Sequence, residues 1–380
     1  MVEFDSLGAA GGGRAEIVEP RVTVLIDTYN YGHFIEQAIE SVLSQDFPLD
    51  SVEILVVDDG STDGTAQRIR KYQKKIQYHY KPNGGQASAF NFGFAIARGE
   101  IVALLDADDY WFPSKLRRIV DEFQKNPELG MVYHRLLELN TETNETAESL
   151  FVALAGYLPD KPSEFIRYFP YPTSCVAFRR RVLQQVLPVP EKLRVQADGY
   201  LGGTMVFAAQ VLGIPDCLAA YRIHGQNLYH GAEATLTRER RQGRIEARQV
   251  LIDGIQVWLA ANGYDRSQAT VRDYLGRWFL YQENDRFILE PPSRLRFFRH
   301  LLAYNYCYRL QTTRRLKIIN QVKAFGSLIV GYEKFYLLDR WGQKAGRIIR
   351  RFLKRRSMQT ETQISDVSDK SPNSDKRDNK

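Results

Sequence analysis

Strand-like and helix-like hydrophobic patterns alternate along residues 21–135. Three apolar runs indicate strands, and the run in VEILVVDDGSTDGT lacks the alternation of a half-exposed strand, which is typical of a strand buried on both faces of a parallel sheet. These runs cover residues 21–27, 52–58 and 101–106, and a weaker strand signal covers 76–80. The segments between them have helical character at 33–45 and 66–75, and residues 83–99 form a glycine-broken turn that enters a helix ending near Gly99. This succession predicts an α/β domain with a largely parallel sheet flanked by helices.

The pattern changes twice further along the chain. Residues 136–230 are irregular and rich in Pro and aromatic residues, and residues 231–357 have helical, charged character. The glycine-rich residues 1–20 are predicted to be a flexible lead-in, and the polar residues 358–380 a disordered tail. We therefore expect an α/β domain over 21–230 followed by a helical extension.

Composition agrees with a globular protein, at 380 residues with 44% hydrophobic and 26% charged residues. Cys175, Cys217 and Cys307 lie far apart, which argues against a disulfide framework or a thiolate metal site and fits a reducing compartment. We find no signal-peptide pattern and no apolar run near the roughly 20 residues that span a bilayer. A cytoplasmic protein is expected.

The net charge of +7 is concentrated in residues 334–356, where nine Lys and Arg residues face one acidic residue. Apolar residues recur there at spacings of three and four, namely Leu338, Trp341, Ala345, Ile348 and Phe352. Such a helix is expected to lie in the plane of an anionic membrane, on its cytosolic face. Two alternatives remain open: a helix packed on the domain with solvated charges, or a nucleic-acid contact, which is not the expected partner.

Polar side chains follow each of the three strong strands, at 27–30, 58–59 and 106–109. The carboxyl ends of parallel strands meet at one edge of a sheet, where ligands bind. If residues 106–109 stay extended, Asp106 and Asp108 face one site and Asp109 faces away. Two such carboxylates, about 6 to 7 Å apart at Cα, can share Mg²⁺ or Mn²⁺. The alternative is that these acids only form a turn before the next helix.

Four segments occur in order: VTVLIDTYNYGHFIEQAIESVLSQ, VEILVVDDGSTDGT, NGGQASAFNFGFAIARGE and IVALLDADD. Together they resemble the family 2 glycosyltransferases, which are nucleotide-sugar-dependent enzymes of the GT-A fold. The resemblance covers residues 21–230 and weakens after 135. It implies a GT-A catalytic domain with a nucleotide-sugar-binding half, 21–135, and an acceptor-side half, 136–230.

The resemblance also assigns roles to particular residues. It implies a donor pocket formed by Thr28, Tyr29, Asp58, Asp59, Gly84, Gly85, Asn91 and Asp106. Asp59 should accept a hydrogen bond from the nucleobase while Asp58 supports the turn. Asp106 and Asp108 match the family's Asp-x-Asp motif, which binds the ribose and the metal-diphosphate. The chain departs from the family pattern at Asp27, where Pro is common, and at Phe90, where Arg is common.

The acceptor-side half offers further candidates. In VQADGYLGG, Asp198 matches the second residue of the family's Glu-Asp pair and is the expected general base, with an Asp-Gly turn as the alternative. YRIHGQNLYH resembles a Tyr-Arg-x-His segment found in many members of the family. His224 could therefore ligate the metal, or it could serve only as a structural hydrogen-bonding residue. Arg222 could pair with a phosphate. Trp111 is expected to pack in the core.

The sequence therefore predicts a metal-dependent, inverting glycosyltransferase that uses Mg²⁺ or Mn²⁺. It would move a sugar from a nucleotide-diphosphate donor to a hydroxyl acceptor, either lipid-linked or part of an envelope polysaccharide. A non-catalytic nucleotide-sugar-binding scaffold is the main alternative. A phosphotransfer enzyme with a strand-end Asp nucleophile is disfavoured because DADDYW lacks the usual Thr. A glycosidase would need neither metal nor nucleotide pocket.

Overall fold

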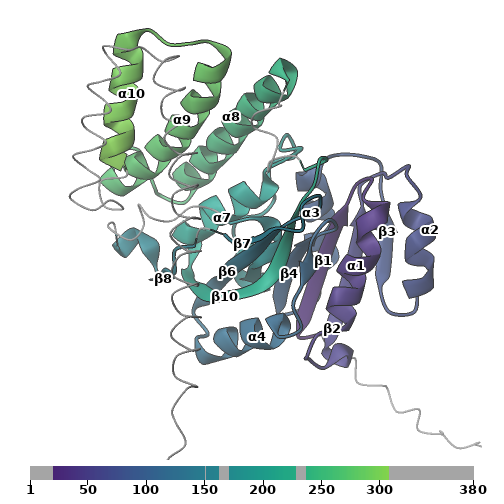
Figure 1. The fold of residues 1–380 in the computed structure, drawn as a ribbon. Coiled ribbons are helices and arrows are strands. Elements are labelled where there is room, and N and C mark those ends of the chain that lie inside the picture. The colour runs from purple at the N-terminus through teal and green to yellow at the C-terminus, as the bar shows by residue number, and fades with distance from the viewer. Residues whose placement is uncertain (1–19, 150, 162–170, 228–236, 308–380) are drawn as a thin grey trace, which may run out of the picture. The chain divides into compact units, whose positions relative to one another are not determined.

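A computed structural model describes residues 20–149, 151–161, 171–227 and 237–307 (Figure 1). The chain forms two compact units, and the boundary between them along the sequence lies between Leu289 and Glu290. The first unit contains the sheet and the helices around it. Among the described residues, the second unit contributes one helix.

The first half of the sheet is parallel. Four strands lie in the order β3-β2-β1-β4, with bounds Gln77–Tyr80, Val52–Asp58, Val22–Thr28 and Ile101–Asp106. All three pairings between them are parallel. The interior positions of β1, β2 and β4 are almost continuously buried. The apolar runs therefore formed the doubly covered parallel strands that their sequences predicted.

The second half mixes directions. Strand β9 (Val176–Arg179) pairs antiparallel with both β4 and β6 (Leu129–Asn140), and β6 pairs parallel with β10 (Gln210–Ile223). Three short strands add antiparallel pairings: β5 (Tyr110–Trp111), β7 (Thr146–Glu148) and β8 (Ala155–Gly156). The irregular sequence of residues 136–230 thus continues the same sheet.

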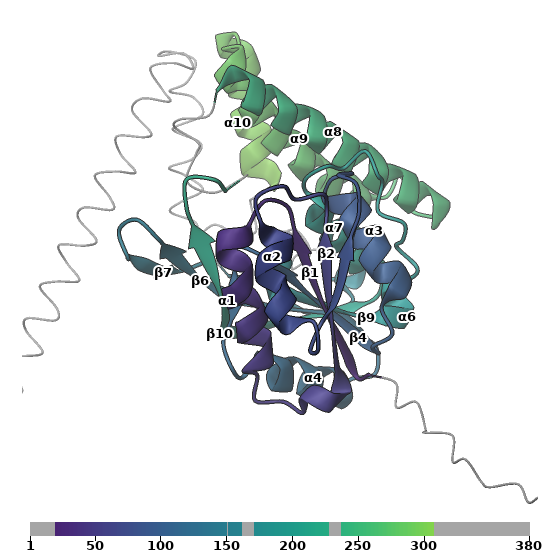
Figure 2. The same cartoon turned by 90° about the vertical axis from the view of Figure 1, so that its right-hand side faces the viewer.

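Helices flank this sheet. They are α1 (Gly32–Leu43), α2 (Thr65–Ile69), α3 (Gln86–Ile96), α4 (Lys115–Lys125), α6 (Arg180–Leu183) and α7 (Ala197–Ala208). Helix α1 buries an apolar stripe and lies beside α2 (Figure 2). Helix α3 packs on β1 and β2, and a Cβ added at Gly93 would meet Leu25 Cδ1 at 2.4 Å. This close approach fixes α3 against the strand that leads into the site.

Two long helices complete the first unit, α8 (Arg238–Ala261) and α9 (Ala269–Leu289). A Cβ added at Gly203 of α7 would meet Ile255 Cδ1 of α8 at 2.7 Å, so the two helices lie close together. Trp258 Nε1 also donates to the main-chain oxygen of Gln185 at 2.9 Å. The helical sequence that begins near residue 231 is therefore not a separate body: its first two helices belong to the unit that carries the sheet.

The second unit contributes α10 (Arg294–Cys307), whose first turn is closed by the Phe297 N–H donating to the Ser293 main-chain oxygen at 2.9 Å. None of the helices in the described ranges has the length and apolar character needed to cross a bilayer. The lead-in at 1–19, the basic segment 334–356 and the polar tail lie outside the described residues.

Candidate active site

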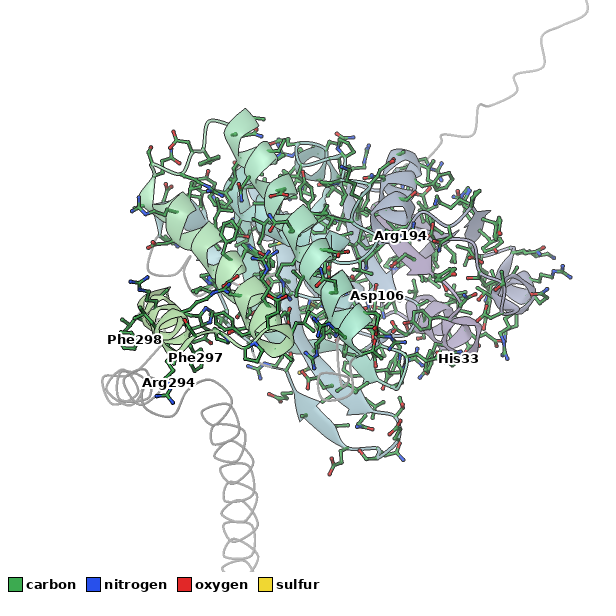
Figure 3. The ribbon with its side chains drawn as sticks, turned by 90° about the horizontal axis from the view of Figure 1, so that it is seen from above. His33, Asp106, Arg194, Arg294, Phe297 and Phe298 are labelled. Carbon is green, nitrogen blue, oxygen red and sulfur yellow. The ribbon has the colours of Figure 1, made fainter. Side chains whose placement is uncertain are left out.

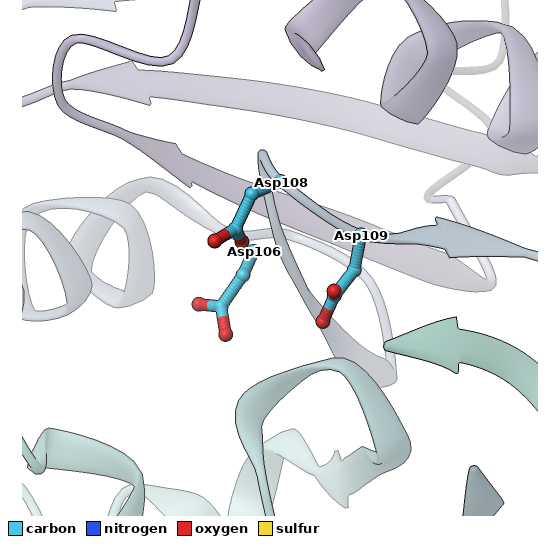
Figure 4. Close-up of side chains that lie close together, drawn as sticks. All are labelled: Asp106, Asp108 and Asp109. Carbon is cyan, nitrogen blue, oxygen red and sulfur yellow. The ribbon is translucent and has the colours of Figure 1, made fainter. Parts of the chain in front are cut away.

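Three carboxylates converge where β4 ends. Asp106, Asp108 and Asp109 each offer an oxygen within 4.8 Å of those offered by the other two (Figure 4). The expectation that Asp109 faces away is wrong. The chain does not stay extended beyond Asp106, because the Asp109 N–H donates to the Asp106 main-chain oxygen at 3.0 Å and closes a turn. We refer to residues 106–109 as the acid turn.

A further acid, Asp27, lies beside this turn because of the sheet register. Asp27 of β1 pairs directly with Asp106 of β4. Burial raises the pKa of Asp27 to about 7, and the charge of Asp108 adds to the rise. Burial, followed by the charges of Asp27 and Asp108, raises the pKa of Asp106 well above its ordinary value. Burial and the neighbouring carboxylates both disfavour the ionised forms of these acids, and a bound cation would favour them.

Arg222 of β10 holds the acid turn in place. Its N–H donates to Asp109 Oδ1 at 2.9 Å, and its guanidinium bonds the main-chain oxygens of Asp108 and, at 3.2 Å, of Asp109. The same guanidinium donates to Gln37 Oε1 at 2.6 Å and lies 4.4 Å from the centre of the Phe34 ring. Arg222 is 4% exposed. Its donors are engaged with protein atoms, so the phosphate pairing considered from sequence is not needed to explain it.

His224 lies against the acid turn, as the sequence suggested. Its Nε2 is 3.1 Å from Asp108 Oδ2, and its Nδ1 accepts the Gln226 N–H at 3.2 Å. A ring nitrogen that accepts has no proton of its own, so this arrangement assigns the ring proton to Nε2, which donates to Asp108. The rings of Phe34 and Tyr31 pack beside the imidazole. His224 therefore orients Asp108 in this structure.

Asp198 lies in the first turn of α7. The Asp-Gly turn considered for it is wrong, because Asp198 and Gly199 are both helical. Burial raises the pKa of Asp198, and its charge in turn contributes to the raised pKa values of Asp27 and Asp106. The fold thus brings Asp198 within electrostatic range of acids at the ends of β1 and β4, which lie far earlier in the chain.

Asp59 organises the loop between β3 and α3. Its two carboxylate oxygens accept the N–H groups of Gly84 at 2.9 Å and Gly85 at 2.7 Å, and Lys81 Nζ lies 2.6 Å from Oδ1. Neighbouring Asp58 accepts the Ser61 N–H at 2.7 Å, which agrees with the turn-supporting role expected of it. These two acids fix the loops that follow β2 and β3.

The loop after β3 and the helix that follows it are also held by contacts with residues 189–194. Gly85 has φ +88°, and a Cβ there would meet the Cα of Arg194 at 2.5 Å, so a side chain is excluded on both counts. Figure 3 labels Arg194 together with Asp106. The Arg194 main-chain oxygen accepts the Gln86 N–H at 3.0 Å. Asn91 bonds the backbone of Val189 through both polar atoms, at 2.8 and 2.9 Å.

The end of β1 presents two contrasting side chains. Thr28 is buried, and its Oγ1 finds no hydrogen-bond partner among the described residues. Tyr29, the next residue, is 49% exposed. An unpaired buried hydroxyl beside an exposed ring is what a ligand contact would satisfy. Trp111 is 2% exposed, which confirms the expectation that it packs in the core.

Sequence reasoning missed two buried residues beside the acid turn. Ser174 accepts the Asp106 N–H on its Oγ at 3.1 Å, and Lys115 Nζ donates to the Ser174 main-chain oxygen at 2.6 Å. The only sequence signal was a lysine two residues after Pro113, at the start of an amphipathic helix where charges are usually exposed.

The fold is shared with solved glycosyltransferases. Crystallised residues 1–349 of S. aureus TarS in complex with UDP-GlcNAc align with a TM-score of 0.50 at 19% identity, over 82% of this chain and 92% of that one. A sheet of this order, with carboxylates at the ends of its parallel strands, places the chain in the GT-A fold class.

Sequence comparison identifies the family. The family model described as Glycosyl transferase family 2 matches residues 23–187. The uncharacterized glycosyltransferase alr2836 of Nostoc sp. is 37% identical over 67% of this chain and 86% of its own length. The uncharacterized glycosyltransferase RP339 of Rickettsia prowazekii is 26% identical over 67% of this chain and 84% of its own length. The chain belongs to glycosyltransferase family 2 and is an enzyme of that kind.

Proposed function

We propose that the protein is a metal-dependent, inverting glycosyltransferase that moves a sugar from a nucleotide-diphosphate donor to a hydroxyl acceptor. The observation that carries this proposal is the convergence of Asp106, Asp108 and Asp109 within 4.8 Å at the carboxyl end of β4. Asp198 lies within electrostatic range of the same cluster. Family membership supplies the reaction class, and these residues supply the chemistry.

The donor set fits Mg²⁺ or Mn²⁺, since both prefer oxygen ligands and commonly use one or two carboxylates plus substrate phosphates. Asp106 and Asp108 would hold the cation, which would stabilise the negative charge that develops on the departing diphosphate. His224 would join as a nitrogen ligand through Nε2 only in the tautomer whose ring proton is on Nδ1, which in this structure accepts the Gln226 N–H instead. With the proton on Nε2 it orients the Asp108 carboxylate.

Asp198 is the proposed general base. Its pKa is raised by burial, which favours acceptance of a proton near neutral pH. As the acceptor oxygen attacks C1 of the sugar, its proton passes to Asp198. The bond between C1 and the diphosphate oxygen breaks, and the electron pair leaves with the diphosphate. One displacement from the opposite face inverts the configuration at C1.

The donor pocket is proposed at the ends of β1 and β2 and in the loop after β3. Thr28 and Tyr29 would line the nucleotide site, and Asp59 would face the nucleobase with Asp58 beneath its turn. Gly84 and Gly85 would let the backbone approach the ribose and diphosphate, because no side chain stands in the way. Asn91 would act indirectly, by holding the segment at Val189.

The assay panel is UDP-, GDP- and dTDP-sugars, each with Mn²⁺ or with EDTA, followed by thermal stabilisation and by donor turnover. Metal-dependent stabilisation with turnover is expected for at least one donor. Stabilisation without turnover would favour the non-catalytic scaffold instead. If Asp198→Asn retains near-parental transfer while folded, Asp198 is not the base.

We further propose that the acceptor is lipid-linked or part of an envelope polysaccharide, reached at the cytosolic membrane face through residues 334–356. This rests on the cationic, amphipathic pattern of that segment, with nine basic residues against one acidic residue. Co-sedimentation of the full chain with anionic vesicles, and not with neutral ones, is expected. Equal binding to both kinds of vesicle, or binding to neither, rejects it.

A further inference from the structure

Lys115 is a buried amine that the proposed reaction does not use. It is the first residue of α4, and its side chain is 0% exposed. Its Nζ donates to the Ser174 main-chain oxygen at 2.6 Å and lies 3.7 Å from the centre of the Trp111 ring. Lysine is almost never fully buried unless its nitrogen is paired. The hydrogen-bond partner of the buried amine therefore indicates its role.

Those atoms lead directly to the acid turn. Ser174 is fully buried, in the 3₁₀ turn Thr173–Cys175. Its Oγ accepts the N–H of Asp106 at 3.1 Å, while its main-chain oxygen accepts Lys115 Nζ. Two hydrogen bonds in series thus connect α4 to the backbone of the residue that ends β4. The Trp111 ring limits where the amine can move.

This connection does not require Lys115 to be charged. Burial lowers the pKa of Lys115 well below its ordinary value, and Cys175 and Asp109 oppose the fall. A neutral amine still donates hydrogen bonds, so the bond to Ser174 is available in either protonation state. If Lys115 instead acted only as a positive charge beside the acids, its removal would strengthen cation binding rather than weaken it.

We propose that Lys115 is a positioning residue of the acid turn. By fixing Ser174 it fixes the backbone at Asp106, and so presets the carboxylates of Asp106 and Asp108 for a divalent cation. This inference rests on the proposed function for the cation, although its backbone part can be measured without one.

The first test is Lys115→Met in the full chain, which keeps most of the side-chain length and its packing on Trp111 but removes the donor. Lys125→Met is the matched control, since Lys125 lies on the same helix with a side chain 66% exposed. Titration with Mn²⁺ alone should show about tenfold weaker binding for Lys115→Met, or about 1.4 kcal/mol. The control should bind as the parent does. Tighter binding by Lys115→Met would mean that the amine acts as a repelling charge, which overturns the proposal.

The second test asks whether Lys115 acts through Ser174. Ser174→Ala removes the acceptor of the Asp106 N–H and should weaken Mn²⁺ binding by a similar factor. Because the two bonds act in series, the double variant should bind no more weakly than the poorer single variant. Losses that multiply in the double variant would show independent roles and reject the connection.

The third test does not involve a cation. Hydrogen exchange at the Asp106 amide, measured in EDTA, should be faster in Lys115→Met than in the parent or in Lys125→Met. If the parent takes up no Mn²⁺, the metal assignment fails and this measurement alone decides the role of Lys115. If Lys115→Met does not fold, Lys115→Gln replaces it, since its shorter amide weakens the bond to Ser174. Unchanged exchange in a folded variant overturns the proposal.

Discussion

Replacing Arg222 with Met tests whether the acid turn is held by one buried guanidinium. The change removes the bonds to the main-chain oxygens of Asp108 and Asp109 and the 2.6 Å bond to Gln37 Oε1. Methionine keeps contact with Phe34, so most of the apolar packing survives. The Arg222 N–H to Asp109 Oδ1 is backbone and is retained. What is lost is the set of donors to three acceptors.

The expected cost follows from the burial of these groups. Arg222 is 4% exposed, and each buried acceptor left without its donor costs about 1–3 kcal/mol, so a loss of about 3–5 kcal/mol is expected for the three acceptors together. For a unit of this size, each kcal/mol shifts the melting temperature by about 2–4 °C, so a fall of about 10 °C is expected. Mn²⁺ binding should weaken as well, because the turn that carries Asp108 loses its backbone anchor.

Thermal melting by circular dichroism in EDTA measures the first effect, and Mn²⁺ titration of the folded variant measures the second. Arg117→Met is the control, since that side chain is 53% exposed and pairs with Asp46 at the surface. No measurable change is expected for it. A melting temperature of Arg222→Met within about 2 °C of the parent would refute the reasoning, because the bonds would then contribute little.

Three further outcomes are expected. Burial pushes the pKa of Glu53 upward, but hydrogen bonds, including those from Arg98, hold it below its ordinary value. The stability that Glu53 adds is therefore present above its unfolded pKa and is lost as pH falls through the folded pKa. In urea melts, Glu53→Gln should lower the free energy of unfolding more at pH 7 than at pH 3. Gly85→Ala forces a side chain into φ +88° and against Arg194. We expect the free energy of unfolding in urea to fall by at least about 1–2 kcal/mol, and nucleotide binding in calorimetry to weaken. Parental values in both measurements would contradict this. Asp106→Asn should abolish Mn²⁺-dependent stabilisation by nucleotide in thermal scans while leaving the fold intact, and a retained shift would remove Asp106 from the site.

The strands of the first half were predictable because their chemistry is local. A run such as 101–105 has no polar position to face water, so it must be covered on both sides, and parallel pairing follows. The register then places Asp27 beside Asp106, which the family resemblance did not indicate because that position is usually Pro. The antiparallel β9 was not predictable from its four residues, since a run that short does not encode a direction.

Four residues of the site could be predicted from the sequence, but the residues that hold the acid turn through its backbone could not. Asp106, Asp108, Asp198 and His224 carry charge or a titratable ring, so their chemistry is visible in the letters of the sequence. Arg222 binds main-chain oxygens, as does Lys115, and no side-chain pattern reveals which oxygens a fold will offer. The close packing of α7 on α8 did leave a signal, because Gly199 and Gly203 stand four residues apart on one helical face.

Arg222 and Lys115 share a feature that explains how the acid turn can be rigid while its carboxylates remain able to bind a cation. The guanidinium of Arg222 bonds the main-chain oxygens of Asp108 and Asp109, and the amine of Lys115 bonds that of Ser174. Neither cationic side chain forms an ion pair with a carboxylate of the turn within the described residues. Had they done so, each would neutralise a charge and occupy an oxygen that a divalent cation needs. Bonding the backbone instead fixes the geometry, while the charge of Arg222 opposes the rise in the Asp109 pKa without its guanidinium occupying a carboxylate oxygen. Substituting these two residues should therefore loosen the turn, and loss of the Arg222 charge should also raise the pKa of Asp109 further, whereas substituting an acid should remove a carboxylate and leave the turn in place.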